Sequence, residues 1–174
     1  TTKIPYIQGM NYMLLPNRAV LGLSGADAES FLQGLISNDL RKLAPGQMMY
    51  AAMLSPQGKF LHDFFIVRRA DAVLLDCDAS RVGDLAARLN LYKLRAQVTI
   101  EKTADGVTAA WGSDTTHGYI DPRLPEMGYR ILGAADTKGW QTADYEAHRI
   151  ALGIPDTQDF IVDKSFLLEM GFED

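Results

Sequence analysis

Asp63 is the residue whose type and surroundings most clearly suggest chemistry. It stands among bulky apolar residues in the segment KFLHDFFIV, residues 59–67, which follows a tight turn at Gly58 and reads as a buried strand. A carboxylate in such a place costs several kcal/mol to bury unless it has a partner. We therefore predict that Asp63 contacts a ligand. The alternative is a carboxylate at a strand end that faces water or holds a loop.

Two aromatic–arginine pairs could serve the same ligand. Tyr92 and Arg95 are three residues apart in LYKLR, and Tyr145 and Arg149 are four apart in a predicted helix. Residues at these spacings share one face of a helix. Each pair could therefore offer a ring and a guanidinium to a flat, anionic molecule. The alternatives are that Arg95 fixes the helix end through a nearby acid, and that Tyr145 is buried beside a solvated Arg149.

Other chemistries have little support in the sequence. His62, His117 and His148 lack metal-binding spacing such as H-E-x-x-H, so no metal site is predicted. The glycine turns at Gly25 and Gly58 form neither a phosphate loop nor a dinucleotide fingerprint, and no Ser/His/Asp arrangement appears. Each histidine is expected to be structural or exposed, and His62 has the best claim to function from its position.

Apolar periodicity predicts the elements that hold these residues. Helical spacing predicts helices after Gly25, at 80–91 and at 142–152, capped by Asp27, Ser80 and Thr142. The turn at 55–58 is expected to join two strands as a hairpin, and Asp105-Gly106 to join two others. The predicted strands are 10–15, 19–23, 47–54, 60–67, 73–76, 98–101, 107–111 and 129–132. This order favours an α+β fold, with antiparallel sheets and flanking helices packed on one face.

Composition bounds the class of protein. The chain has 174 residues, 47% hydrophobic and 22% charged, which is enough for one compact domain with subdomains. A net charge of −5 without a Lys/Arg run argues against direct nucleic-acid binding. Cys77 is the only cysteine, which suggests a reducing compartment.

Location is predicted from the absence of targeting and membrane patterns. Residues 1–8 show no signal pattern, and no apolar segment has membrane-spanning length. We therefore expect a cytoplasmic protein without a membrane partner. A mature organellar form whose targeting peptide has been removed is the alternative.

Five segments, in order, resemble one protein family. VLGLSGADAESFLQGLISNDL, residues 20–40, resembles the opening block of the glycine-cleavage T-protein superfamily. The four later blocks are SPQGKFLHDFFIV (55–67), LYKLRAQVTI (91–100), DPRLPEMGYR (121–130) and YEAHRIALGIP (145–155). The closer resemblance is to the YgfZ branch, folate-binding proteins tied to iron–sulfur cluster maintenance. The sequence lacks that branch's Lys-Gly-Cys-Tyr block and C-terminal β-domain.

The resemblance implies one folate-binding domain over 1–174, built of intertwined α+β subdomains around a folate-sized opening. It implies tetrahydrofolate or a derivative as cofactor, and iron–sulfur enzymes or assembly proteins as partners. It also implies an indirect link to tRNA modification through cluster-carrying enzymes. No catalytic residue is assigned, although Asp63 and His62 are candidates; Arg18 and Phe64 are further folate-contact candidates. The implied folate contacts are Asn38, Asp39, Met53, Asp63, Tyr92, Arg95, Tyr145, Arg149 and Glu169.

Two positions depart from the aminomethyltransferases of the superfamily. An acidic pair is expected at the start of the strand, but its first member is His62. The acidic residue expected two places after Arg149 is Ala151, and Glu169 is the suggested replacement, unless Glu169 is a solvated carboxylate. The preferred function is therefore assembly or repair of iron–sulfur enzymes. The alternatives are transfer of a one-carbon unit from a lipoyl-bound aminomethyl group to tetrahydrofolate, and a folate-free scaffold.

Overall fold

Two five-stranded sheets form the frame of the protein. The computed structural model describes residues 9–112 and 118–166. Sheet A has the strand order β10 (Gln141–Thr142), β1 (Asn11–Leu14), β7 (Val107–Trp111), β9 (Tyr129–Leu132) and β8 (Tyr119–Ile120). Sheet B has the order β3 (Met48–Leu54), β4 (Phe60–Arg68), β5 (Ala72–Asp78), β2 (Arg18–Ser24) and β6 (Thr99–Lys102). Neighbouring strands are antiparallel except for the parallel pair β1 and β10.

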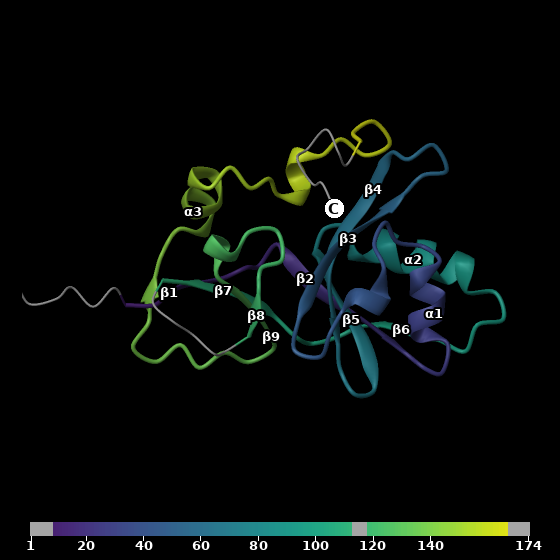
Figure 1. Cartoon of the computed structure of the whole chain (residues 1–174), viewed down its shortest axis with the longest axis horizontal. Helices are drawn as coiled ribbons and strands as arrows, with labels where there is room; N and C mark the ends of the chain where they lie inside the picture. The colour runs from purple at the N-terminus through teal and green to yellow at the C-terminus, as the bar shows by residue number, and fades with distance from the viewer. Residues whose placement is uncertain (1–8, 113–117, 167–174) are drawn as a thin grey trace, which may run out of the picture.

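Short helices connect and cover these strands. The α-helices are α1 (Ala28–Gln33), α2 (Val82–Lys93) and α3 (Tyr145–Ala151). The 3-10 helices are η1 (Leu40–Lys42), η2 (Pro125–Met127) and η3 (Thr157–Asp159). Helices α1 and α2 lie against sheet B, whereas α3 lies beside sheet A (Figure 1). The predicted α+β class is confirmed, but the helices do not all pack on one face.

Sheet B is the middle layer of the protein. Successive side chains along its strands point alternately toward the helices and toward sheet A. On β4, Phe64 and Ile66 face the helices, while Phe65 and Val67 face sheet A. Leu85 and Leu89, four residues apart on α2, are fully buried on the helix side. Burying each such leucine contributes about 1.5–3 kcal/mol.

The chain after α3 returns to sheet B. We call residues 154–166 the strap; it crosses from α3 to the start of β4 (Figure 1). The ring of Phe160 stacks on that of Phe60 with centroids 4.6 Å apart. The Asp163 N–H donates to the Phe60 carbonyl, and the Phe60 N–H donates to the Ser165 carbonyl. Two segments about 100 residues apart in sequence are thereby joined.

The predicted hairpin through Asp105-Gly106 is wrong. Strand β6 pairs with β2 in sheet B, whereas β7 lies between β1 and β9 in sheet A. Residues 103–106 therefore cross from one sheet to the other. Local turn chemistry favoured a hairpin, but Val107 packs in the core between the sheets, and that burial decides the pairing.

Two predicted helix caps are also wrong. Both the hydroxyl and the N–H of Ser80 donate to the Asp78 carboxylate, and α2 begins two residues later. Thr142 lies in β10, and α3 is capped by Asp144, whose carboxylate accepts from the Glu146 N–H at 3.0 Å. In α3 an aspartate takes the backbone-binding role expected of a hydroxyl, whereas α2 has no side-chain hydrogen bond at its N-cap, Arg81.

Asp27 occupies the predicted N-cap position of α1, but its side chain acts elsewhere. The carboxylate accepts from the Gln97 N–H at 2.7 Å. It therefore pins the start of α1 to the segment that enters β6.

Gly128 provides a test of the close approach between η2 and sheet A. Its φ is +90°, and a Cβ there would lie 2.2 Å from the Ala110 carbonyl oxygen. Gly128→Ala should lower the free energy of unfolding by more than about 1 kcal/mol, because both the backbone and the space are unsuitable. Gly83→Ala is the matched control, since Gly83 lies in α2 and its Cβ would meet nothing within 4 Å.

Urea denaturation followed by circular dichroism measures both variants. Gly83→Ala should raise stability by about 0.5–1 kcal/mol. Equal stability of Gly128→Ala and the wild type would contradict the close approach.

Candidate functional site

Asp63 is buried on the face of sheet B that meets sheet A. Its alternation with Phe65 along β4 points its carboxylate between the two sheets. One carboxylate oxygen accepts from the Tyr50 hydroxyl at 2.8 Å, and the other accepts from the Thr157 hydroxyl at 2.8 Å. The partners that this carboxylate needs are therefore supplied by the chain itself.

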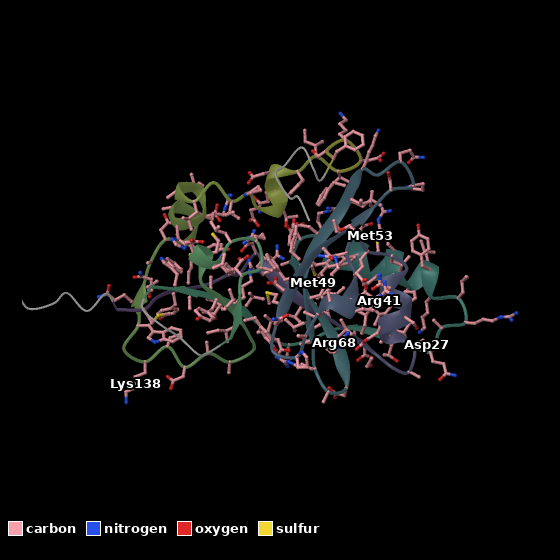
Figure 2. The ribbon with its side chains drawn as sticks, viewed as in Figure 1. Asp27, Arg41, Met49, Met53, Arg68 and Lys138 are labelled. Atoms are coloured by element: carbon pink, nitrogen blue, oxygen red, sulfur yellow. The ribbon has the colours of Figure 1, made fainter. Side chains whose placement is uncertain are left out.

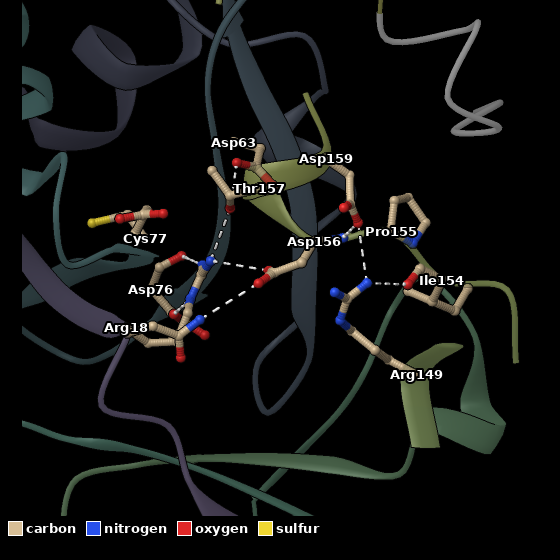
Figure 3. Close-up of polar contacts among 12 residues, drawn as sticks. Arg18, Asp63, Asp76, Cys77, Arg149, Ile154, Pro155, Asp156, Thr157 and Asp159 are labelled. Atoms are coloured by element: carbon tan, nitrogen blue, oxygen red, sulfur yellow. Dashed lines mark hydrogen bonds and ion pairs between the residues drawn. The ribbon is translucent and has the colours of Figure 1, made fainter. Parts of the chain in front are cut away.

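Arg18 lies next to this carboxylate (Figure 3). Its Nε donates to the Asp76 carboxylate at 2.7 Å, and one terminal nitrogen donates to the Asp76 carbonyl at 2.7 Å. The other terminal nitrogen donates to the Thr157 hydroxyl oxygen at 3.1 Å. Thr157 therefore lies between a carboxylate and a guanidinium group, because its hydroxyl donates to Asp63 and accepts from Arg18.

The same network continues into sheet A. Arg130 donates to the second oxygen of Asp76 at 2.5 Å, and Arg123 donates to Asp121 at 2.7 Å. The Tyr145 hydroxyl accepts from Arg130 at 3.1 Å and from Arg123 at 3.2 Å. We call these residues the inter-sheet network: Arg18, Tyr50, Asp63, Asp76, Asp121, Arg123, Arg130, Tyr145 and Thr157.

Charge is balanced within the inter-sheet network, which contains three arginines and three aspartates. Burial acts to lower the pKa of Arg130, but Asp76 and its neighbours outweigh burial and raise it. Burial likewise acts to raise the pKa of Asp121, but Arg123 and Arg130 hold it below its ordinary value. Burial raises the pKa of Tyr50, and the adjacent Asp63 raises it further, so this hydroxyl stays protonated and donates.

Phe65 lies beneath the three guanidinium groups of the network. The central carbon of Arg130 is 3.8 Å from the ring centroid, that of Arg123 is 4.7 Å away and that of Arg18 is 5.6 Å away. The face of an aromatic ring attracts cations, most strongly where water is excluded. Phe65 therefore helps to hold three buried cations in one place.

The structure brings together three of the sequence-predicted residues, Asp63, Tyr145 and Arg18. Asn38 lies at the edge of this group: its amide donates to the Tyr50 carbonyl at 3.1 Å. Asp39 points away, caps η1 and pairs with exposed Arg41 at 2.8 Å. The hydrogen bonds from Arg41 lower the pKa of Asp39 to about 2.

The other predicted folate contacts lie elsewhere. Met53, like Phe64, is buried on the helix side of sheet B (Figure 2). Tyr92 is 55% exposed at the end of α2, and Arg95 is exposed just beyond it. Glu169 and His117 lie outside the described residues. Within 9–112 and 118–166, the predicted contacts therefore do not gather around a single opening.

Arg149 ties α3 to the strap. It pairs with Glu146 at 2.6 Å and Asp159 at 3.1 Å, and it donates to the Ile154 carbonyl at 3.1 Å. The adjacent Glu146 raises the pKa of Arg149 above its ordinary value. In this structure Arg149 therefore stabilises the contact between α3 and the strap.

A hollow of about 320 Å³ opens beside the inter-sheet network. Its wall includes Leu15, Asn17, Tyr145 and Asp156. It reaches the network at Tyr145, and neither Asp63 nor Thr157 belongs to its wall. The Asp63 carboxylate is bonded to Thr157, whose neighbours Asp156 and Gln158 do line the hollow.

His62 faces the opposite side of sheet B from Asp63. It is buried against α2, where its Nε2 lies 2.7 Å from an Asp84 carboxylate oxygen. Burial lowers the pKa of His62, and Arg81 lowers it further, so the neutral ring donates to Asp84. Ala151, the other departure from the aminomethyltransferase pattern, is exposed on α3. Neither departure belongs to the inter-sheet network.

Sequence reasoning did not single out Tyr50, Asp76, Arg130 or Thr157. A usable signal was present for two of them: Asp76 and Arg130 each stand two residues from a buried leucine in the same strand, so they share its face. Opposite charges at core-facing positions of different strands suggest a buried pair. Thr157 lies in an irregular segment and carries no such signal.

Asp76→Asn tests how far the network supports the fold. The change leaves Arg18 and Arg130 buried without their carboxylate, and removing one partner of a buried pair costs about 3–5 kcal/mol. Thermal denaturation should show a large fall in the melting temperature. Asp39→Asn, which breaks an exposed pair, is the control and should melt like the wild type. If Asp76→Asn and Asp39→Asn had similar melting temperatures, the ion pairs of Asp76 would not be needed for the stability of the fold.

His62 predicts a pH dependence of stability. The unfolded-state pKa of histidine is about 6.5, and burial lowers the folded-state value. Below about pH 6.5 the unfolded chain therefore binds a proton that the folded chain excludes, so the free energy of unfolding falls as pH falls. Urea denaturation from pH 7.5 to 5 measures this loss. His62→Gln should flatten the profile, and an unchanged slope would assign the loss to other groups.

The family model described as GCVT N-terminal domain matches residues 19–111. The iron–sulfur cluster assembly factor IBA57 homologue, mitochondrial, of Mycosarcoma maydis is 34% identical over 170 residues, which cover 80% of this chain and 42% of that protein. The mitochondrial assembly factor IBA57 of Mus musculus is 29% identical, covering 82% of this chain and 50% of that protein.

One solved structure shares the fold. The glycine cleavage system aminomethyltransferase T from Bartonella henselae superposes with a TM-score of 0.54 at 15% sequence identity. The match covers 85% of this chain and 33% of that chain. At this identity the likeness concerns the fold alone.

These relatives correct the predicted location, and they match this chain over only part of their own length. The predicted cytoplasmic location is wrong by this comparison, because the matched assembly factors of fungi and mouse are named as mitochondrial proteins. The expectation rested on the residues at the start of the given sequence, and a targeting pattern is not part of a folded domain. The chain spans about half the length of these relatives or less. Among the described residues, no helix has the length and apolarity needed to cross a membrane.

Proposed function

Since this chain belongs to the GCVT N-terminal domain family, we propose that it acts in the assembly of iron–sulfur clusters as a protein that binds reduced folate. The observation that carries the first part is the 34% identity, over 80% of the chain, to a protein named as an iron–sulfur cluster assembly factor. Within the superfamily we propose a YgfZ-type protein. Its link to tRNA modification would be indirect, through enzymes that carry clusters.

The second part of the proposal rests on the surroundings of Thr157. Its hydroxyl gives a hydrogen to Asp63 and receives one from Arg18, at 2.8 and 3.1 Å. The amide-like edge of a pterin presents a donor beside an acceptor, so it could satisfy the same two groups. The donor set therefore fits a reduced folate, while Thr157 occupies the place. When bound, the folate would carry the one-carbon unit.

Cys77 is poorly suited to cluster ligation. The thiol is buried in sheet B, and burial raises its pKa to about 12. A thiolate is the form that ligates iron, and this thiol stays protonated at neutral pH. Cys77 is therefore not offered to a cluster in this conformation.

Two other functions remain as alternatives. The first is an aminomethyltransferase, and the departures at His62 and Ala151 carry less weight against it because both lie outside the inter-sheet network. A folate-free scaffold is favoured by Thr157, which already satisfies Asp63 and Arg18. We prefer the assembly function because the matched relatives share it by name.

Asp63→Asn tests the folate site. The change keeps the shape but removes the charge that a pterin N–H would meet, so affinity for tetrahydrofolate should fall about 10- to 100-fold. Isothermal titration calorimetry measures affinity, and melting curves confirm folding. Asp39→Asn, with its carboxylate outside the network, should bind like the wild type.

The assembly function is tested in cells that lack the gene. Wild-type protein should restore the activity of iron–sulfur enzymes, and Asp63→Asn should restore less. Release of methylene-tetrahydrofolate from an aminomethylated carrier protein would point to the transferase instead. Full rescue together with no saturable folate binding would support the scaffold.

A further inference from the structure

We infer that the strap is a cover over the folate site, with Thr157 as its built-in occupant, and that folate binds only after the strap lifts. This inference rests on the proposed folate function and adds how access to that site is controlled. It begins from the burial of Asp63 against Thr157, since both side chains are about 95% buried. A ligand and Thr157 cannot occupy the same place.

The floor of the site is held chiefly within sheet B, and Arg18 also lies 3.9 Å from the Asp156 carboxylate of the strap. Arg18 is held by two hydrogen bonds to Asp76, and Asp63 is held by Tyr50, all within sheet B. Lifting Thr157 would therefore leave an acceptor at Asp63 and a donor at Arg18, both already positioned. Buried groups of this kind need partners. The incoming molecule must bring a donor and an acceptor side by side, as the amide-like edge of a flat heterocycle does.

The strap has the features of a segment that can open locally. Thr157 and Phe160 are buried, and the Pro155 carbonyl accepts from Arg123 at 3.1 Å, whereas Gln158, Ile161 and Val162 are exposed. Its regular structure is the short helix η3 alone. Few buried contacts and an exposed backbone are typical of segments with low local stability. Arg149 holds Ile154 and Asp159, which lie on either side of Thr157, so the strap would lift together with α3.

Phe160 allows the cover to be weakened at a residue that is not part of the inter-sheet network. Its ring, three residues beyond Thr157, stacks on that of Phe60 with centroids 4.6 Å apart. Phe160→Ala should therefore raise the open fraction and tighten tetrahydrofolate binding about tenfold. A purely structural role would leave affinity equal or reduced. Phe160→Leu is a milder variant in case the alanine variant unfolds, and exposed Ile161→Ala is the matched control.

A disulfide allows the cover to be locked. Lys59 and Phe166 form an antiparallel bridge next to the bond from the Phe60 N–H to the Ser165 carbonyl. Opposed Cα atoms in such a pair lie about 4.5–5.5 Å apart, within disulfide reach. The double variant Lys59→Cys/Phe166→Cys should bind folate weakly when oxidised and normally when reduced. Cys77 does not compete, because burial raises its pKa to about 12.

Hydrogen exchange completes the experiment on the full protein. Tetrahydrofolate should speed exchange at the Asp163 amide, because lifting the strap breaks its bond to the Phe60 carbonyl. Faster exchange, tighter binding by Phe160→Ala and weaker binding by the oxidised lock together support the inference. Equal binding by locked and unlocked protein, or protection of Asp163 by folate, overturns it while the folate function stands. Absence of folate binding in every variant overturns both.

Discussion

The fold depends on the fully buried carboxylate of Asp76, which holds arginines from both sheets. One oxygen accepts from Arg18 of sheet B and the other from Arg130 of sheet A. Each charge would cost several kcal/mol to bury alone, so each sheet needs the other to complete its hydrogen bonds. Apolar layers could slide past one another at little cost, whereas this pairing has one register. The relative position of the sheets is thus set by electrostatics as much as by packing.

The same arrangement explains why a polar site lies at the centre of an apolar interface. Phe65 and Tyr145 supply aromatic surface, while Asp63 and Arg18 supply charge close to it. A buried polar group gains strength from the low dielectric around it, provided that it is satisfied. Thr157 satisfies it from a segment distant in sequence. The hydrogen bonds of Asp63 and Arg18 at the centre of the interface are therefore completed by the strap.

The sequence predicted strands and helices well, because apolar periodicity reports burial directly. The segments at 47–54, 60–67 and 107–111 correspond closely to β3, β4 and β7. Pairing was less predictable: β6 and β7 are neighbours in sequence, but they join different sheets because their burial is satisfied by different cores. The burial of Asp63 was signalled by its apolar neighbours in the sequence, whereas its partner Thr157 lies 94 residues away and was not foreseen. Tyr92 and Arg95 were wrongly placed with Asp63, since helix-face spacing does not say which way the face points.

The outer edge of β3 has a consequence for association between molecules. Ser37 exchanges two hydrogen bonds with Ala52, at 2.9 Å each, and Asn38 donates to the Tyr50 carbonyl. These contacts use backbone groups that an unpaired border strand would offer to a foreign chain. At the two borders of sheet A, β8 and β10 have only two residues each. Recruitment of another polypeptide by strand addition, and the fibrillar aggregation that can follow from it, is thereby disfavoured along these borders.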